Sequence, residues 1–143
     1  MTATRTRQRV GSDGTLEQRP FVLVVHRSAG LRNTLLSALD FEGFDVMTMV
    51  DDDEAAVIVK HIPPHAMVVD RRLANTAQNE CASAARRAHI PMIAFDDAAM
   101  MPPIERCLDI GIQPVDWSGG VVRLLQMLHE VAVPPAHVLS SIA

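Results

Sequence analysis

Short, largely apolar runs recur along the chain, and each is bounded by proline, glycine or charged residues. Residues 21–25 and 66–69 are the clearest, because both are continuous and contain several valines. Runs of this kind are typical of strands that are buried on both faces of a parallel sheet. The same pattern predicts further strands over residues 46–50, 90–95 and 112–117. Pro114 interrupts the last run and places it at an edge of the sheet, where a missing N–H is tolerated.

Between these runs, apolar residues recur at the three- and four-residue spacing of a helix face. Over residues 29–41 they are preceded by Ser28, a favourable N-cap, and followed by Gly43, which ends the helix. Further helices are predicted over residues 51–62, 77–88, 98–110 and 121–131. We interpret the acidic run 51–54 as the start of the second helix, stabilised by the helix dipole, rather than as a metal site.

Five strands that alternate with five helices predict an α/β fold with right-handed crossovers. We expect a flavodoxin-like, doubly wound parallel sheet of five strands in the order 2-1-3-4-5. This domain spans residues 20–132. Residues 1–19 lack the apolar content needed for a core and are expected to be a disordered leader, and residues 133–143 form a C-terminal tail.

Composition narrows the class of protein. A length of 143 residues suits one domain, and a net charge of −4 argues against binding of nucleic acid by this domain. Cys81 and Cys107 lie in helix-like segments, and no apolar stretch is long enough to cross a membrane. We therefore expect a protein of a reducing compartment, the cytoplasm.

Asp70 directly follows the apolar run at residues 66–69. In an open parallel sheet, ligands and chemistry gather just beyond the carboxyl ends of the strands, so Asp70 is a candidate for the working group of the fold. A second interpretation stays open, in which Asp70 only begins a turn or caps the next helix.

Several fragments together resemble the receiver domain of bacterial two-component response regulators, over about residues 20–132. The fragments that carry the resemblance are residues 21–25, Leu31 with Arg32, and residues 67–70, 90–95 and 107–111. The resemblance implies a signalling module in a phosphorelay, with a histidine kinase or another signalling protein as its partner.

The pocket of that family has a defined set of residues, and this chain matches only one of them. An Asp at the end of the third strand accepts the phosphoryl group, and Asp70 matches it. His26 and Arg27 stand where an acidic pair would hold Mg²⁺. Asp96 stands in place of a Ser or Thr that ends the fourth strand, and Ser118 in place of a Lys that ends the fifth.

These replacements predict a pseudo-receiver, a stand-alone module that acts by protein contact and is not an enzyme. Attack of a carboxylate on a phosphoryl group needs cations that neutralise the transferred oxygens, and Mg²⁺ prefers oxygen ligands. An imidazole and a guanidinium are poor substitutes for such ligands. We therefore expect an internally stabilised pocket, in which Arg27 or protonated His26 pairs with Asp70 or Asp96.

Two other roles for His26 follow from the same residues. If a carboxylate raises its pKa, His26 makes the domain sensitive to pH, whereas a purely structural role is the simpler alternative. His26, Asp70 and Asp96 also form a trio that suits Zn²⁺ better than Mg²⁺, but Arg27 beside them argues against a metal. We expect neither a metal nor a cofactor.

The predicted fourth helix and fifth strand form the candidate partner face. Met100, Met101 and Trp117 lie near it, and Val115 stands at the position of the family's switch aromatic. This face commonly mediates dimerisation in receivers, which makes a homodimer one predicted assembly. Two other functions stay open: a conventional response regulator phosphorylated on Asp70 with Mg²⁺, and a flavodoxin-like small-molecule binder. The latter lacks a glycine-rich phosphate loop at residues 26–30.

Overall fold

The computed structural model describes residues 4–5, 19–74, 79–96, 107, 111–116 and 120–132. The strands are β1 (Thr4–Arg5), β2 (Phe21–Val25), β3 (Asp45–Met49), β4 (Ala66–Val69), β5 (Met92–Asp96) and β6 (Ile112–Asp116). The helices are α1 (Ala29–Phe41), α2 (Asp52–His61), α3 (Arg71–Ala74), α4 (Glu80–Arg87) and α6 (Val121–Val131). None of the helices in the described part of the chain has the length and hydropathy to cross a membrane.

The strands form one sheet in the order β1-β3-β2-β4-β5-β6. All neighbours from β3 to β6 are parallel, so the predicted five-stranded order 2-1-3-4-5 is confirmed. β6 with Pro114 lies at an edge, as predicted. The two-residue strand β1 pairs antiparallel with β3 and falls within the stretch predicted to be a disordered leader. Without β1, the outer edge of β3 would present unpaired backbone groups, which readily accept another strand.

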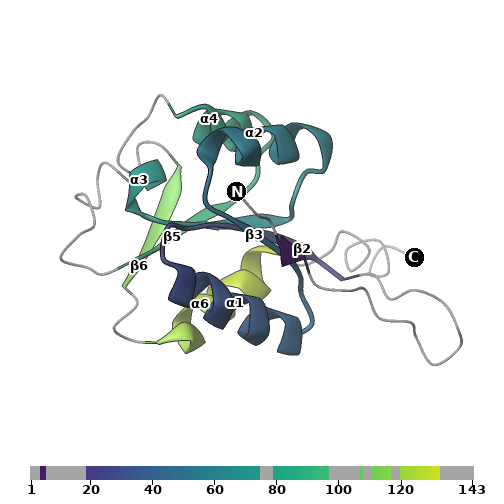
Figure 1. Ribbon diagram of the computed structural model, residues 1–143, viewed down its shortest axis with the longest axis vertical. Helices are drawn as coiled ribbons and strands as arrows, with labels where there is room; N and C mark the ends of the chain where they lie inside the picture. Colours follow the sequence, from purple (N-terminus) through teal and green to yellow (C-terminus); the bar gives the residue numbers. More distant parts are fainter. Residues whose placement is uncertain are drawn as a thin grey trace, which may run out of the picture.

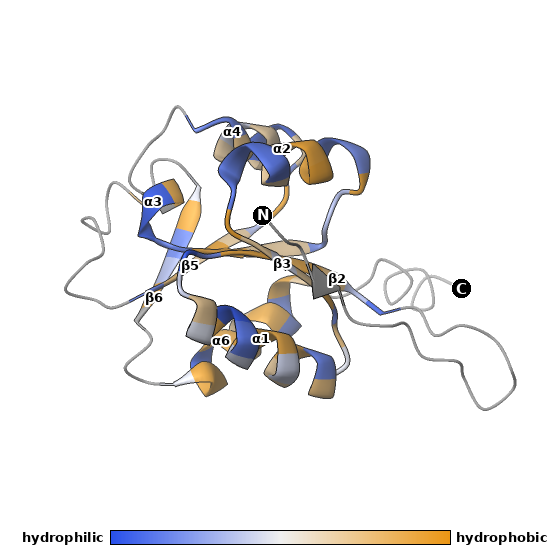
Figure 2. Cartoon of the chain, in the orientation of Figure 1, coloured by the Kyte–Doolittle hydropathy of each residue, from blue (hydrophilic) through white to orange (hydrophobic). Residues whose placement is uncertain are grey.

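Two helical layers cover the sheet: α2 and α4 lie on one face, and α1 and α6 on the other (Figure 1). Successive residues of a strand enter different cores, because side chains alternate across a strand. Val25 and Val69 pack in the core under α2 and α4, whereas Val24 and Val68 pack in the core under α1 and α6. Figure 2 shows β2 and β3 mainly in apolar colours between helices of mixed polarity.

The capping residues and the terminating glycine that the sequence predicts for the first two helices have these roles in the structure. The Ser28 hydroxyl accepts a hydrogen bond from the Leu31 N–H at 3.2 Å, and α1 is followed by Gly43 in the left-handed region at φ +98°. Asp51 caps α2 by accepting from the N–H groups of Asp53 at 2.7 Å and Glu54 at 3.2 Å, in agreement with the capping interpretation of the acidic run.

Several segments differ from the sequence prediction or lie outside the described residues. The sequence predicted no helix or strand between residues 70 and 77, but Arg71–Ala74 form the helical turn α3 directly after Asp70. Helix α4 begins at Glu80, behind the N-cap Asn79, rather than at residue 77. Of the helix predicted over residues 98–110, only Cys107 belongs to the described part of the chain, where it is helical and buried. The tail 133–143 and the leader apart from residues 4–5 and 19 lie outside the described residues.

Candidate functional site

Three strands end in polar side chains at the same edge of the sheet. Asp70 follows β4, His26 follows β2, and Asp96 is the last residue of β5. The exposed fractions of these residues are 0 %, 1 % and 5 % respectively. Because β2, β4 and β5 are adjacent in the sheet, these three predicted site residues form one buried polar cluster.

The Asp70 carboxylate is surrounded by donors. Its Oδ2 accepts from the backbone N–H of Arg27 at 2.8 Å, and its Oδ1 accepts from the backbone N–H of Arg72 at 2.9 Å. The Nε of Arg72 lies 3.0 Å from both carboxylate oxygens, and Nη2 of Arg72 lies 2.9 Å from Oδ2. Burial alone would raise the pKa of Asp70, but the hydrogen bonds from Arg72 and Arg27 outweigh it and lower that pKa. Asp70 is thus a buried, ionised carboxylate.

The Arg72 guanidinium sits among oxygens from three elements. Besides Asp70, its Nη2 lies 3.1 Å from the Val50 carbonyl oxygen after β3 and 3.9 Å from Asp52 Oδ1 at the start of α2. The hydrogen bond to Asp70 raises the pKa of Arg72. Asn79, the N-cap of α4, donates to Asp52 Oδ2 at 3.1 Å. Arg72 therefore links Asp70 to the layer formed by α2 and α4.

The counter-charge of Asp70 is not one of the two predicted from the sequence. Arg27 or protonated His26 was expected to pair with Asp70 or Asp96, but Arg72 makes the ion pair with Asp70. The Arg27 side chain is exposed, and only its backbone N–H reaches the Asp70 carboxylate. An Asp at a strand end often accepts a hydrogen bond from the backbone two residues later. This local turn is the signal that could have pointed to Arg72.

His26 is held between an acceptor and a donor. Its Nε2 lies 2.9 Å from the Phe95 carbonyl oxygen, and its Nδ1 accepts from the Ser28 backbone N–H at 3.1 Å. A carbonyl can only accept and an amide N–H can only donate, so the ring is neutral and carries its proton on Nε2. Burial lowers the pKa of His26, and the hydrogen bond to Phe95 and the charges of Asp70 and Asp96 offset this only in part.

These contacts and the lowered pKa contradict three predicted roles of His26. The histidine is not a protonated partner of a carboxylate, and its pKa is lowered rather than raised. Both ring nitrogens are engaged, so His26 is not placed to ligate a metal with Asp70 and Asp96. Within the described ranges, no group of three or more His, Cys, Asp or Glu residues could hold a metal ion.

Of the remaining predicted residues, two belong to the described part of the chain and four do not. Asp96 Oδ2 accepts from the backbone N–H of Arg71 at 3.1 Å, and Val115 is buried in the core under α1 and α6. Four predicted residues lie outside the described part of the chain: Met100, Met101, Trp117 and Ser118. Cys81 is buried, and this burial raises the pKa of its thiol to about 12, so it is not a reactive thiolate.

Comparison with known proteins gives a likeness of structure only. No family model matches the sequence, and no curated protein matches it either. The chemotaxis protein CheY4 of Vibrio cholerae is similar in structure with a TM-score of 0.65 and 17 % identity, over 80 % of this chain and 99 % of that one. A response regulator receiver protein from Pseudomonas putida has a TM-score of 0.60 and 22 % identity, over 80 % of this chain and 98 % of that one.

A third similar structure is the receiver domain of a sensor histidine kinase from Pseudomonas aeruginosa, with a magnesium ion coordinated in its active site cleft. Its TM-score is 0.64 at 18 % identity, and the match covers 80 % of this chain and 98 % of that one. The chain thus has the flavodoxin-like fold of response regulator receiver domains.

Proposed function

We propose that this chain is a receiver-like signalling module of two-component systems that acts by protein contact and is not phosphorylated. The observation that carries the proposal is the pairing of Asp70 with Arg72: the residue at the phosphoacceptor position is fully buried, and both its oxygens are engaged. In this proposal the chain is not an enzyme, needs no cofactor, and has a histidine kinase or another signalling protein as its partner.

The contacts of Asp70 oppose phosphorylation in two ways. A carboxylate that attacks phosphorus must free a lone pair, and each charge-assisted hydrogen bond that it gives up is worth about 1.5–3 kcal/mol. The transferred oxygens also need cations, but His26 and Arg27 offer no carboxylate oxygen for Mg²⁺. The guanidinium of Arg72 already neutralises Asp70, so the pocket has its counter-ion without a metal.

One observation favours the alternative of a conventional, Mg²⁺-dependent response regulator. The Arg72 side chain is 32 % exposed, so the guanidinium lies at the mouth of the site and can leave without unfolding the core. Once it left, a phosphodonor could approach Asp70 from the carboxyl ends of the strands, where ligands gather in this fold.

The test is intact mass after treatment with acetyl phosphate and Mg²⁺, together with the response to beryllofluoride. We expect that the wild-type chain gains no phosphoryl group and that beryllofluoride does not change its Trp117 fluorescence, because Asp70 stays paired with Arg72. A conventional receiver treated in parallel shows that the reagents work. A phosphoryl group that is gained by the wild type and lost in Asp70→Asn would overturn the proposal.

The proposed assembly concerns the face around β6. A homodimer through β6 and residues 98–110 stays a prediction, since most of that segment lies outside the described residues. Sedimentation velocity over a range of protein concentrations tests it. A concentration-dependent dimer that is unaffected by acetyl phosphate fits a module that works by constitutive contact.

A further inference from the structure

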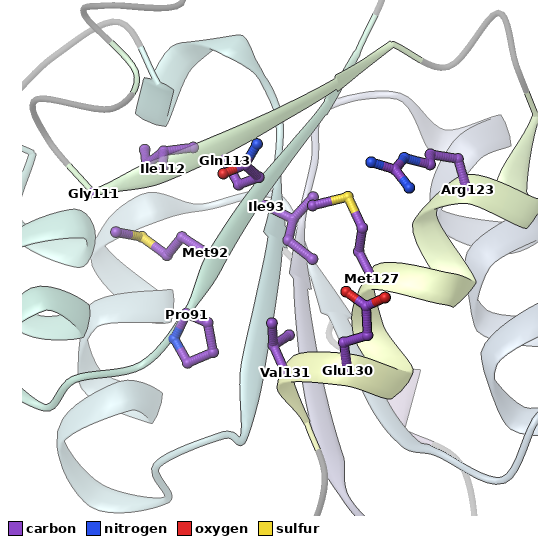
Figure 3. Close-up of a pocket in the computed structure, with 10 residues that line it drawn as sticks. All are labelled: Pro91, Met92, Ile93, Gly111, Ile112, Gln113, Arg123, Met127, Glu130 and Val131. Atoms are coloured by element: carbon purple, nitrogen blue, oxygen red, sulfur yellow. The ribbon is translucent and has the colours of Figure 1, made fainter.

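A second candidate site lies at the amino ends of the strands, whereas Asp70 lies at their carboxyl ends. Figure 3 shows the residues that line a hollow between α6 and the strands β5 and β6. The volume of this hollow is about 560 Å³. Pro91 and Gly111, which line it, directly precede β5 and β6, whereas Asp70 follows β4. The hollow therefore opens at the amino ends of the strands and shares no residue with the Asp70 cluster.

The lining combines an apolar floor with a few polar groups. Ile93 of β5 and Met127 and Val131 of α6 supply apolar surface, and Met127 extends from the helix toward the strands (Figure 3). The volume falls within the range of about 300–1,000 Å³ that is typical of pockets for small ligands. Such pockets are mainly apolar, and a small number of polar groups fix the orientation of the ligand.

Three polar side chains that line the hollow are available to bind a ligand. Gln113, Arg123 and Glu130 line it, and none of them has a hydrogen-bond or ion-pair partner within the ranges that the structure describes. Arg123 and Glu130 are seven residues apart on α6. They lie on the same side of the helix, about 10 Å apart along its axis at 1.5 Å per residue. A cation and an anion thus mark the two ends of one apolar surface.

We propose that this hollow binds a short apolar peptide with free termini. The ligand carboxylate pairs with Arg123, its ammonium group pairs with Glu130, and its apolar body covers Ile93 and Met127. An extended chain advances about 3.3–3.6 Å per residue, so three residues span the distance between the two charges. The Gln113 amide can donate to and accept from a peptide group of the ligand.

A ligand seated against α6 fits better than an added strand. β6 is an edge strand, but Pro114 in its middle removes a backbone donor and blunts the edge against pairing. The inference does not rest on the Asp70 site, because the two sites lie at opposite ends of the strands. Asp70→Asn should accordingly leave peptide binding unchanged.

The experiment is a titration of the full ¹⁵N-labelled chain with the tripeptide Ala-Leu-Ala, followed by NMR. We expect saturable shifts at millimolar peptide, confined to amides of β5, β6 and α6. Arg123→Gln should weaken binding of the free peptide about two- to fivefold, as expected for an exposed ion pair, and leave the C-amidated peptide unaffected. Glu130→Gln should do the same for the free peptide and leave the N-acetylated peptide unaffected.

Arg87→Gln on α4 and Glu54→Gln on α2 are matched controls, because both residues are exposed and outside the hollow. The absence of shifts would overturn the proposal, as would shifts that do not depend on the peptide termini or on Arg123 and Glu130. If these amides instead shift on dilution without peptide, and Arg123→Gln abolishes a dimer, the hollow is a contact between two copies and the proposal is wrong.

Discussion

At the scale of single residues, the pairing of Asp70 with Arg72 illustrates how a buried charge is kept ionised. A carboxylate without exposure is tolerated when several donors replace its hydration, and here two backbone N–H groups and one guanidinium do so. Leaving such a charge unpaired is expensive, whereas removing both partners together costs less. The pair therefore makes a prediction about stability that is separate from signalling.

Arg72→Ala should lower the free energy of unfolding by about 2–4 kcal/mol, because Asp70 stays buried without its counter-ion. Arg72→Ala combined with Asp70→Asn should recover part of that loss. Urea denaturation of the wild type, both single variants and the double variant gives the coupling energy. Arg27→Ala is the control and should cost less than about 0.5 kcal/mol, because its side chain is exposed. Equal losses in Arg27→Ala and Arg72→Ala would contradict the assignment of the counter-ion.

The sequence could predict part of this site and not the rest. Asp70 and His26 were identified because each follows an apolar run, and a parallel sheet brings such ends together. The role of Arg72 depends on α3, a single turn too short to show a helical period. The neutral state of His26 depends on Phe95 and Ser28, whose backbone positions follow only from the folded strands.

At the scale of elements, strand positions were predictable and several boundaries were not. β2 and β4 match their apolar runs, since burial on both faces leaves a continuous pattern. β5 begins at Met92 rather than at residue 90, because Ile90 belongs to the end of α4: its N–H donates to the Ala85 carbonyl at 2.9 Å. The hydrogen bonds that end a helix leave no pattern in the hydrophobicity of the sequence, so this boundary could not be predicted from it.

Helices α1 and α4 end in the same hydrogen-bonded motif, but the residue at positive φ differs between them. After α4, the N–H of His89 donates to the Arg86 carbonyl and the N–H of Ile90 donates to the Ala85 carbonyl, the two bonds of a Schellman motif. After α1, Gly43 and Phe44 make the equivalent bonds. The residue in the left-handed region is Gly43 at φ +98° in one helix and His89 at φ +58° in the other.

His89→Gly should therefore raise the free energy of unfolding by about 0.5–1 kcal/mol, because glycine adopts positive φ without the Cβ penalty. Gly43→Ala should lower it by about 1–2 kcal/mol for the same backbone reason, since a Cβ at that position meets nothing within 4 Å. Urea denaturation measures both changes. His61→Gly, in the last turn of α2, is the control and should destabilise, because glycine lowers helix stability at ordinary helical φ. A loss of stability in His89→Gly would contradict the strain assigned to His89.

At the scale of the whole molecule, His26 joins the sheet to the first helix. Its ring bonds β5 through the Phe95 carbonyl and accepts from Ser28, which caps α1, while the Arg32 guanidinium donates to the His26 carbonyl at 2.7 Å. Protonation of Nδ1 would remove the acceptor for Ser28 and place a buried positive charge near the guanidinium of Arg72. The charges of Asp70 and Asp96 lessen this cost without cancelling it.

The sign of the resulting pH dependence follows from the lowered pKa of His26. Above the ordinary histidine pKa of about 6.5, the ring is neutral in both folded and unfolded chains, and its full contribution to stability is present. Below that value the unfolded chain binds the proton first, so stability falls as the pH drops toward the folded pKa. Urea denaturation between about pH 7.5 and pH 5 should show this loss, and His26→Gln should flatten the slope, because an amide can donate and accept without titrating. His61→Gln is the matched control, because it replaces a histidine that is exposed at the end of α2 by the same residue. A slope that His26→Gln does not alter would mean that other groups carry the pH dependence of the fold.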